Sequence, residues 1–131
     1  MIKLICFLVF CLIVIFPITV SNAYIKLNYK NYKYEIEKLN KEKTEISIRK
    51  IIQCESEGNS NIWGDKNYVY PSFGIVQMQN RTFLWLADLS GKKKLNWKNP
   101  NHQIQLLKWA LENGQGNLWS CFRILKKKGE I

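Results

Sequence analysis

Residues 48–59 of the chain read IRKIIQCESEGN, and the spacing of the apolar residues in this stretch predicts the first helix of a small domain. Four side chains recur at i, i+3, i+4 and i+7 and therefore share one helical face: Ile48, Ile51, Ile52 and Glu55. Gly58 and Asn59 follow, a pair that commonly ends a helix. We therefore expect a helix from about Thr44 or Ser47 to Glu57, with an apolar stripe that ends in a carboxylate.

Three further helices are expected along the chain. Asn favours the N-cap, Pro the first helical position and Gly the position after the last turn. On these signals the second helix runs from an N-cap at Asn80 to before Gly91, the third from Asn99-Pro100 to Gly114, and the fourth from Leu118 to Leu125. Residues 59–79 show no clear alternation and are expected to form a loop or small hairpin. The predicted fold class is mainly α, a small helical domain with this loop or hairpin between its first two helices.

The chain upstream of this domain carries the features of a leader and a spacer. Lys3 is followed by an apolar run, and Ser21-Asn22-Ala23 ends the run with the small residues of a cleavage site. Residues 1–23 are therefore expected to be a signal peptide, or an uncleaved membrane anchor through residues 4–20. Both alternatives export the rest of the chain to the cell envelope. Residues 24–46 are rich in Lys and Tyr and are interpreted as a basic spacer, which leaves residues 47–131 as the domain.

Cys54 and Cys121 are the two cysteines outside the leader, an even pair in a compartment that permits oxidation. A disulfide between them would close a loop of nearly seventy residues and stabilise the fold by about 4 kcal/mol. Two buried free thiols are the alternative. The single histidine, His102, shares no zinc-ligand spacing with either cysteine, so no metal or other cofactor is expected.

Glu55 is the candidate for chemistry. A glutamate on the core-facing side of a helix loses hydration, which raises its pKa and keeps it protonated for general-acid work. Glu57 lies on the other side of the helix and should face water. The alternative for Glu55 is a carboxylate at a helix end that is paired with Lys or Arg.

Several short motifs, taken in their order and spacing, resemble lytic transglycosylases of the lysozyme-like superfamily, and in particular the short bacterial variants of the soluble lytic transglycosylase catalytic domain. The motifs are Cys54-Glu55-Ser56-Glu57-Gly58-Asn59, Ser72-Phe73-Gly74-Ile75-Val76-Gln77 with Thr82-Phe83, Asn99-Pro100 with Gln103-Ile104, and Trp119-Ser120-Cys121. The resemblance covers about residues 48–125. It implies a lysozyme-like fold in which Glu55 is the catalytic acid and base.

The resemblance also implies which residues bind the substrate. Ser56 matches the small polar residue after the glutamate, and Gly74 and Gln77 match a motif that lines the sugar cleft. Gln77 could instead brace the backbone, and Gly74 could serve backbone geometry or close sugar approach. From the residues alone, Ser72 is expected near Glu55. The remaining aromatic residues divide into two groups, with Tyr68 and Tyr70 expected to stack on sugars and Trp63, Trp85, Trp97 and Trp119 expected in the core.

The function that the resemblance implies is cleavage of peptidoglycan glycan strands between N-acetylmuramic acid and N-acetylglucosamine, with a 1,6-anhydromuramic product. A hydrolytic muramidase would need a second carboxylate, for which Asp65 and Asp88 are the candidates. A non-catalytic wall-binding module is a further alternative. The net charge of +10 also suits a nucleic-acid binder, but an export leader argues against nucleic acid as partner. A monomer is expected.

Overall fold

The computed structural model describes the backbone of residues 2–131 and the side chains of residues 26 and 28–131. The expected leader, residues 1–23, lies outside the described side chains, and in the part that is described no helix is long and apolar enough to span a bilayer. Contacts divide the chain into two units, Met1–Asn40 and Lys41–Ile131. The second unit holds the core and both cavities described below.

The first helix, α1, spans Ile2–Ser56 and so begins far upstream of the predicted start at Thr44 or Ser47. Residues 24–46 contain no Gly or Pro, so nothing local in that stretch interrupts the helix. The helix ends at Ser56, one residue before the predicted end at Glu57. Glu57 and Gly58 have positive φ angles of 54° and 83°, a left-handed conformation that stops helical hydrogen bonding. Glu57 is exposed, as expected.

The other helices lie close to where their capping residues predicted them, with two differences. Helix α2 spans Asn80–Leu89 and helix α3 spans Pro100–Glu112, and the side chain of Asn99 accepts hydrogen bonds at the start of α3 as predicted. The N-cap of α2 is Gln79 rather than Asn80. The predicted fourth helix is divided into a 3-10 turn, η1 (Gly116–Leu118), and α4 (Ser120–Lys127), because Trp119 between them is extended.

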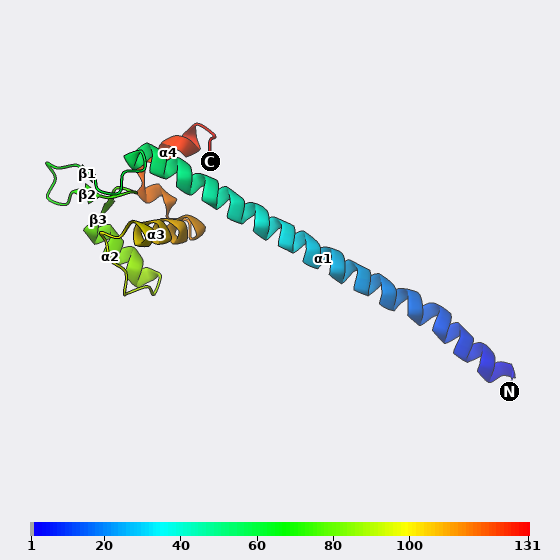
Figure 1. Ribbon diagram of the computed structural model, residues 1–131. Helices are drawn as coiled ribbons and strands as arrows, with labels where there is room; N and C mark the ends of the chain where they lie inside the picture. Colours follow the sequence, from blue (N-terminus) through cyan, green and yellow to red (C-terminus); the bar gives the residue numbers. More distant parts are fainter. Residues whose placement is uncertain (1) are drawn as a thin grey trace. The chain divides into compact units, whose positions relative to one another are not determined.

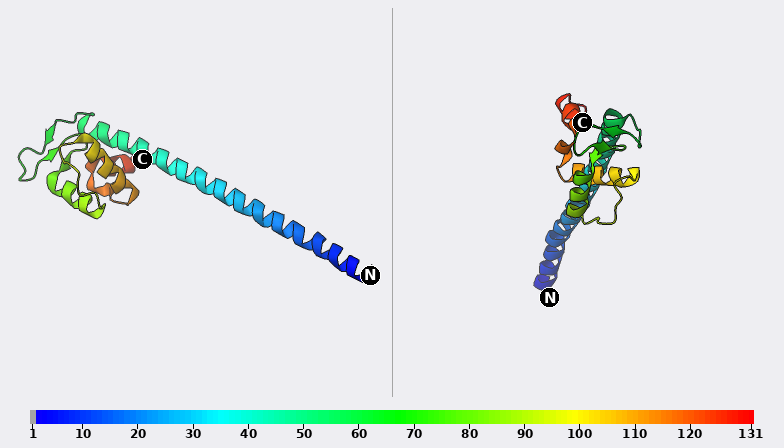
Figure 2. Two further views of the ribbon diagram at one scale, coloured as in Figure 1. Left: turned by 60° about the horizontal axis from the view of Figure 1, so that its bottom comes forward. Right: turned by 90° about the vertical axis from the view of Figure 1, so that its left-hand side faces the viewer.

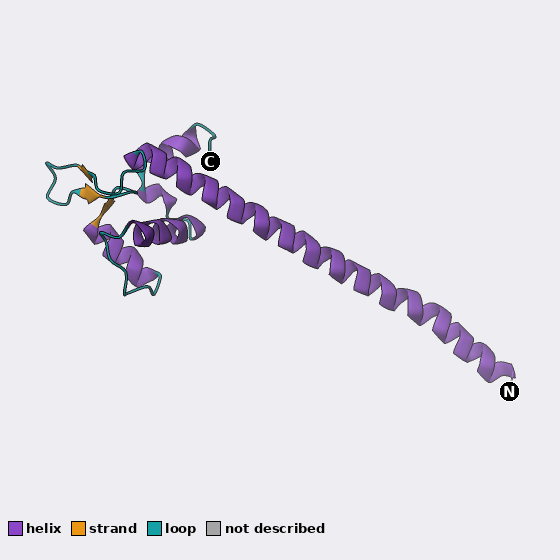
Figure 3. Ribbon diagram, in the orientation of Figure 1, coloured by secondary structure: helices purple, strands orange, loops and turns teal. Residues whose placement is uncertain are grey.

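A small antiparallel sheet connects α1 to α2, where a loop or hairpin was expected (Figure 3). Its strands are β1 (Trp63–Gly64), β2 (Ser72–Phe73) and β3 (Met78–Gln79), in the order β1-β2-β3. In its register, Ser72 pairs with both Gly64 and Gln79. The domain is therefore mainly helical, which confirms the predicted fold class.

The core lies between the last turns of α1 and the helices α2, α3 and α4. Figure 1 shows α2 and α3 side by side, and Figure 2 shows the same helices from two further directions. The buried core residues are Ile48, Ile51, Val76, Met78, Phe83, Leu86, Ala87, Leu106, Leu107, Ala110, Trp119 and Leu125. Burial of these apolar side chains is the main stabilising contribution, at about 25 cal/mol per Å² removed from water.

One polar side chain is buried among these residues and joins three segments. Gln103 of α3 is 0% exposed, and its Nε2 donates to the carbonyl oxygens of Phe73 (3.1 Å) and Trp97 (2.7 Å). Its Oε1 accepts from the backbone N–H of Val76 at 3.4 Å. A buried amide is stable only when its groups are paired, so Gln103 fixes the chain around β2 and β3 against α3.

Candidate active site

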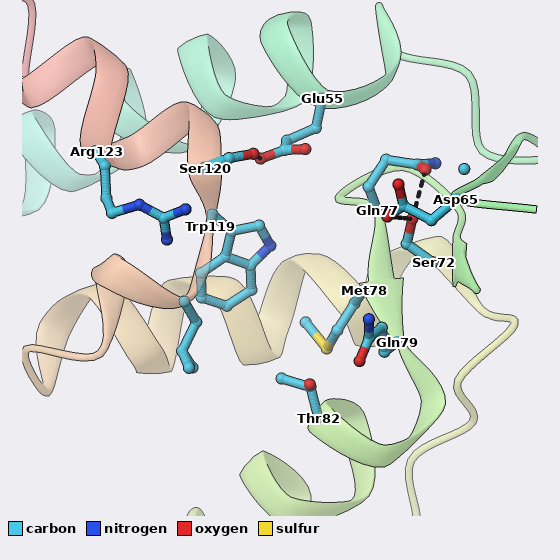
Figure 4. Close-up of a pocket in the computed structure, with 12 residues that line it drawn as sticks. Glu55, Asp65, Ser72, Gln77, Met78, Gln79, Thr82, Trp119, Ser120 and Arg123 are labelled. Atoms are coloured by element: carbon cyan, nitrogen blue, oxygen red, sulfur yellow. Dashed lines mark hydrogen bonds between the residues drawn. The ribbon is translucent and has the colours of Figure 1, made fainter. Parts of the chain in front are cut away.

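A polar cavity of about 460 Å³ opens where the end of α1, the sheet, the start of α2 and the start of α4 meet (Figure 4). These elements come from widely separated parts of the sequence. The cavity is lined by Glu55, Gly64, Asp65, Ser72, Gln77, Met78, Gln79, Thr82, Leu118, Trp119, Ser120 and Arg123. Of the residues singled out in the sequence, Glu55, Ser72 and Gln77 line this one cavity.

Glu55 is held at the cavity through one of its two carboxyl oxygens. Oε1 accepts the backbone N–H of Cys121 at 3.1 Å. It also accepts the hydroxyl of Ser120 at 3.3 Å, and Figure 4 shows these two side chains beside each other. The Cys121 N–H belongs to the first turn of α4, where backbone donors have no partner within the helix, so the carboxyl group also caps α4. From the described residues, Oε2 receives no hydrogen bond. Oε2 is therefore free to exchange a proton with a bound molecule.

The surroundings of Glu55 favour its protonated form. Burial raises the pKa of the Glu55 carboxyl above its usual value, and the negative charge of Asp65 adds to this increase. The hydrogen bonds from Cys121 and Ser120 and the charge of Arg123 lower the pKa but do not cancel the effect of burial. No ion pair in the described part of the chain involves Glu55, so the alternative of a paired glutamate is not what the structure adopts.

The predicted disulfide is confirmed and lies directly beside this carboxyl group. Cys54 and Cys121 are bonded, with their Cα atoms 5.9 Å apart, and they are 67 positions apart in sequence. Cys54 precedes Glu55, and Cys121 supplies the N–H that Glu55 accepts. The cross-link therefore joins the two chain segments that determine where Glu55 lies.

The sheet side of the cavity is a separate polar network. The hydroxyl of Ser72 lies 3.1 Å from Gln77 Oε1 and 3.3 Å from Asp65 Oδ2, and Figure 4 shows these three side chains together. Ser72 therefore contacts Asp65 and Gln77 rather than Glu55. Gln77 Nε2 donates to the carbonyl oxygens of Gly74 (2.8 Å) and Ile62 (3.2 Å), so Gln77 braces the backbone as well as lining the cavity.

Ser56 and Gly74 support the site from behind instead of lining it. The buried hydroxyl of Ser56 donates to the carbonyl oxygen of Ile75 at 2.6 Å and ties α1 to the turn before β3. Gly74 has a φ of +84°, and a Cβ built there would lie 2.5 Å from Nε2 of Gln103. The glycine is thus required for backbone geometry and for close approach of the Gln103 amide.

The aromatic residues are arranged differently from the prediction. Tyr68 and Tyr70 are 71% and 56% exposed in the loop between β1 and β2, and the structure does not bring them to the cavity. Trp119 is buried as expected, with its indole N–H donated to the carbonyl oxygen of Val76. The expectation of core positions is wrong for Trp63, which is 41% exposed, and for Trp85, which is 45% exposed.

Trp97 and Trp63 share a cluster at the edge of the sheet. Half-buried Trp97 donates its indole N–H to the carbonyl oxygen of Met78 at 2.8 Å. Trp63 packs against Phe73 and Trp97 with ring centroids 4.7 Å and 5.8 Å away. Trp63 therefore covers the edge of the core without being buried in it.

Ser120 and Arg123 line the cavity but were given no role in the sequence analysis, and Asp65, which was considered only as a second carboxylate, lines it as well. Asp65 follows β1 directly and has a positive φ of 49°, so its position depends on a turn that the sequence did not define. Ser120 and Arg123 are three positions apart at the start of α4, a helical spacing that could have placed them on one face. Asp88, the other carboxylate considered, is exposed and lies 3.3 Å from the Lys93 ammonium.

Comparison with known proteins gave no match to any family profile, curated protein or solved structure. Among the described residues, no group of three His, Cys, Asp or Glu side chains could hold a metal ion. Function therefore has to be argued from the cavity and its side chains.

Proposed function

We propose that this domain is a peptidoglycan lytic transglycosylase that cleaves the β-1,4 bond between N-acetylmuramic acid and N-acetylglucosamine. The observation that carries the proposal is the state of Glu55. Its carboxyl group is partly buried, which raises its pKa, and it is held at a polar cavity through Oε1 while Oε2 accepts no hydrogen bond from the described residues. The motif resemblance and the +10 net charge, which suits an anionic wall polymer, support it. The disulfide supports a location outside the cytoplasm.

In this mechanism Glu55 acts twice. Protonated Glu55 first donates its proton to the glycosidic oxygen, which leaves an oxocarbenium-like carbon on the muramic acid. The resulting carboxylate then accepts the proton of the muramic 6-hydroxyl, whose oxygen bonds to the anomeric carbon. The product is the 1,6-anhydro sugar, and no water is consumed. The raised pKa of Glu55 suits the first step, because a carboxyl with an ordinary pKa is ionised near neutral pH.

The direct test compares Glu55→Gln with Glu57→Gln in the full-length protein. Glutamine at position 55 can still accept the hydrogen bond from Cys121, but it cannot transfer the proton, so turnover on purified cell walls should fall by at least about 10²-fold. Glu57 is exposed and two positions away, so Glu57→Gln should remain active. An active Glu55→Gln variant would contradict the assignment of Glu55 as the catalytic acid. If the wild-type protein binds cell walls but does not cleave them, the alternative of a wall-binding module is favoured.

A hydrolytic muramidase is the second candidate, and the position of Asp65 favours it. Asp65 lines the same cavity as Glu55 and takes part in no ion pair in the described part of the chain, so it could direct a water or stabilise the positive carbon. Mass spectrometry of the released fragments separates the two reactions. The transglycosylase gives anhydromuramic ends and survives Asp65→Asn, whereas the hydrolase gives reducing muramic ends and is inactivated by that change.

A further inference from the structure

A second cavity adjoins the first along the start of α2. It has a volume of about 410 Å³ and is lined by Gln79, Arg81, Thr82 and Trp85. Gln79 and Thr82 also line the Glu55 cavity. The two cavities are therefore neighbours, separated by the side chains of Gln79 and Thr82.

Trp85 provides an open aromatic surface at this second cavity. The buried face of α2 is formed by Phe83, Leu86 and Ala87, and Trp85 lies off that face with 45% of its surface exposed. It is not part of the aromatic cluster around Trp97. An indole that is exposed beside a cavity does not gain the free energy that burial in the core would give. A bound molecule that covers the indole can supply this burial, and exposed aromatic side chains at cavities are therefore typical of binding surfaces.

Arg81 adds an uncompensated positive charge to the same cavity. It lies four positions before Trp85, on the same side of α2, and is exposed. In the part of the chain that the structure describes, none of the ion pairs involves Arg81. A guanidinium with free donors binds a carboxylate through two parallel hydrogen bonds.

We propose that this second cavity is a distal subsite for the same glycan strand. One pyranose ring packs its C–H face on the Trp85 indole, and Arg81 binds the carboxylate of the lactyl group on a muramic acid that carries no stem peptide. The proposal rests on the proposed function, because the strand bound at the second cavity is the same strand that Glu55 cleaves. It adds a sugar unit and a charged group that the Glu55 cavity alone does not recognise.

The first test measures binding by calorimetry, with N-acetylglucosamine oligomers of increasing length as probe. The full-length Glu55→Gln protein serves as the parent, so that nothing is cleaved. Trp85→Ala should weaken binding of the longest oligomers by about tenfold and leave the shortest unchanged, while Trp85→Phe should restore part of the loss. Leu84→Ala is the matched control, because Leu84 is an exposed apolar residue on α2 that lines neither cavity.

The second test uses peptide-free glycan strands, whose muramic acids carry free lactyl carboxylates. Arg81→Gln should weaken binding of these strands by about tenfold relative to the neutral oligomers. Arg49→Gln, which removes an exposed arginine of α1 away from both cavities, controls for total charge. If Arg81→Gln weakens the binding of charged strands and neutral oligomers equally, the proposed role of Arg81 is overturned.

The outcomes distinguish this subsite from the proposed function itself. If Trp85→Ala binds every oligomer as Leu84→Ala does, the subsite is wrong while the assignment of Glu55 stands. If the parent binds no oligomer and wild type releases no wall fragments, the proposed function fails, and the subsite fails with it.

Discussion

Replacement of Gly74 by alanine should destabilise the domain far more than the same change at a glycine without neighbours. Gly74 has a φ of +84°, and in this left-handed region an alanine costs about 1–2 kcal/mol. The added Cβ would also lie 2.5 Å and 2.6 Å from Nε2 and Oε1 of Gln103. That amide must move, although it is fully buried and holds three hydrogen bonds.

The magnitude follows from these contacts. Each buried polar group that loses its partner costs about 1–3 kcal/mol, so the whole effect of Gly74→Ala should be about 3–6 kcal/mol. Gly91 provides the matched control, because its φ of +69° is similar and no atom lies within 4 Å of the built Cβ. Gly91→Ala should therefore cost only the backbone strain of about 1–2 kcal/mol.

Urea unfolding followed by circular dichroism measures both variants on one scale. A difference of several kcal/mol between Gly74→Ala and Gly91→Ala is comparable to the stability of many small domains, so the midpoints should separate clearly. Gln103→Ala removes the obstructing amide, so adding Gly74→Ala to that variant should cost only the strain. Equal losses for Gly74→Ala and Gly91→Ala would refute the close packing of Gly74 against Gln103.

Three further predictions concern Glu55 and its surroundings. If protonated Glu55 is the acid, kcat/KM falls as pH rises through the raised pKa of Glu55. In a pH profile, this fall in kcat/KM should move to lower pH in Asp65→Asn, because the charge of Asp65 raises the pKa, and to higher pH in Arg123→Gln, because the charge of Arg123 lowers it. Because folding raises the pKa of Glu55, ionisation of this carboxyl costs more in the folded than in the unfolded protein, and wild type loses stability as pH rises above the ordinary pKa of a glutamate. Thermal unfolding at increasing pH should therefore show the stability of Glu55→Gln rising relative to that of wild type. Reducing the Cys54–Cys121 disulfide should lower the free energy of unfolding by about 4 kcal/mol, measured by urea unfolding with and without reductant.

Local sequence signals were sufficient for most of the fold. The cap at Asn99 and the end of α1 before Gly58 depend on residues within a few positions of each other. The cap was predicted correctly, and the end of α1 was predicted to within one residue. The fourth helix was not predicted correctly, because its interruption depends on a distant contact. Trp119 is extended so that its buried indole can donate to the carbonyl oxygen of Val76, 43 positions away in sequence. No pattern near Trp119 carries that information.

The candidate site divides in the same way. Glu55 could be identified from the period of a single helix, which placed it on the apolar face. Asp65 and Arg123 reach the same cavity only because β1 pairs with β2 and α4 packs beside α1, so their proximity depends on the whole fold. Trp85 was assigned to the core by residue type, although its place on α2 leaves it outside the buried face.

The loop between β1 and β2 has a consequence for how this domain can be engineered. Tyr68, Val69 and Tyr70 are between 56% and 84% exposed, and none belongs to the core. Loops of this kind accept replacement and insertion, because few contacts depend on them. Libraries randomised at these three positions should therefore keep the fold, provided that Asp65 at the start of the loop is left unchanged, because it lines the Glu55 cavity. The tip of this loop is therefore a place where new residues can be introduced without changing the side chains that line the Glu55 cavity.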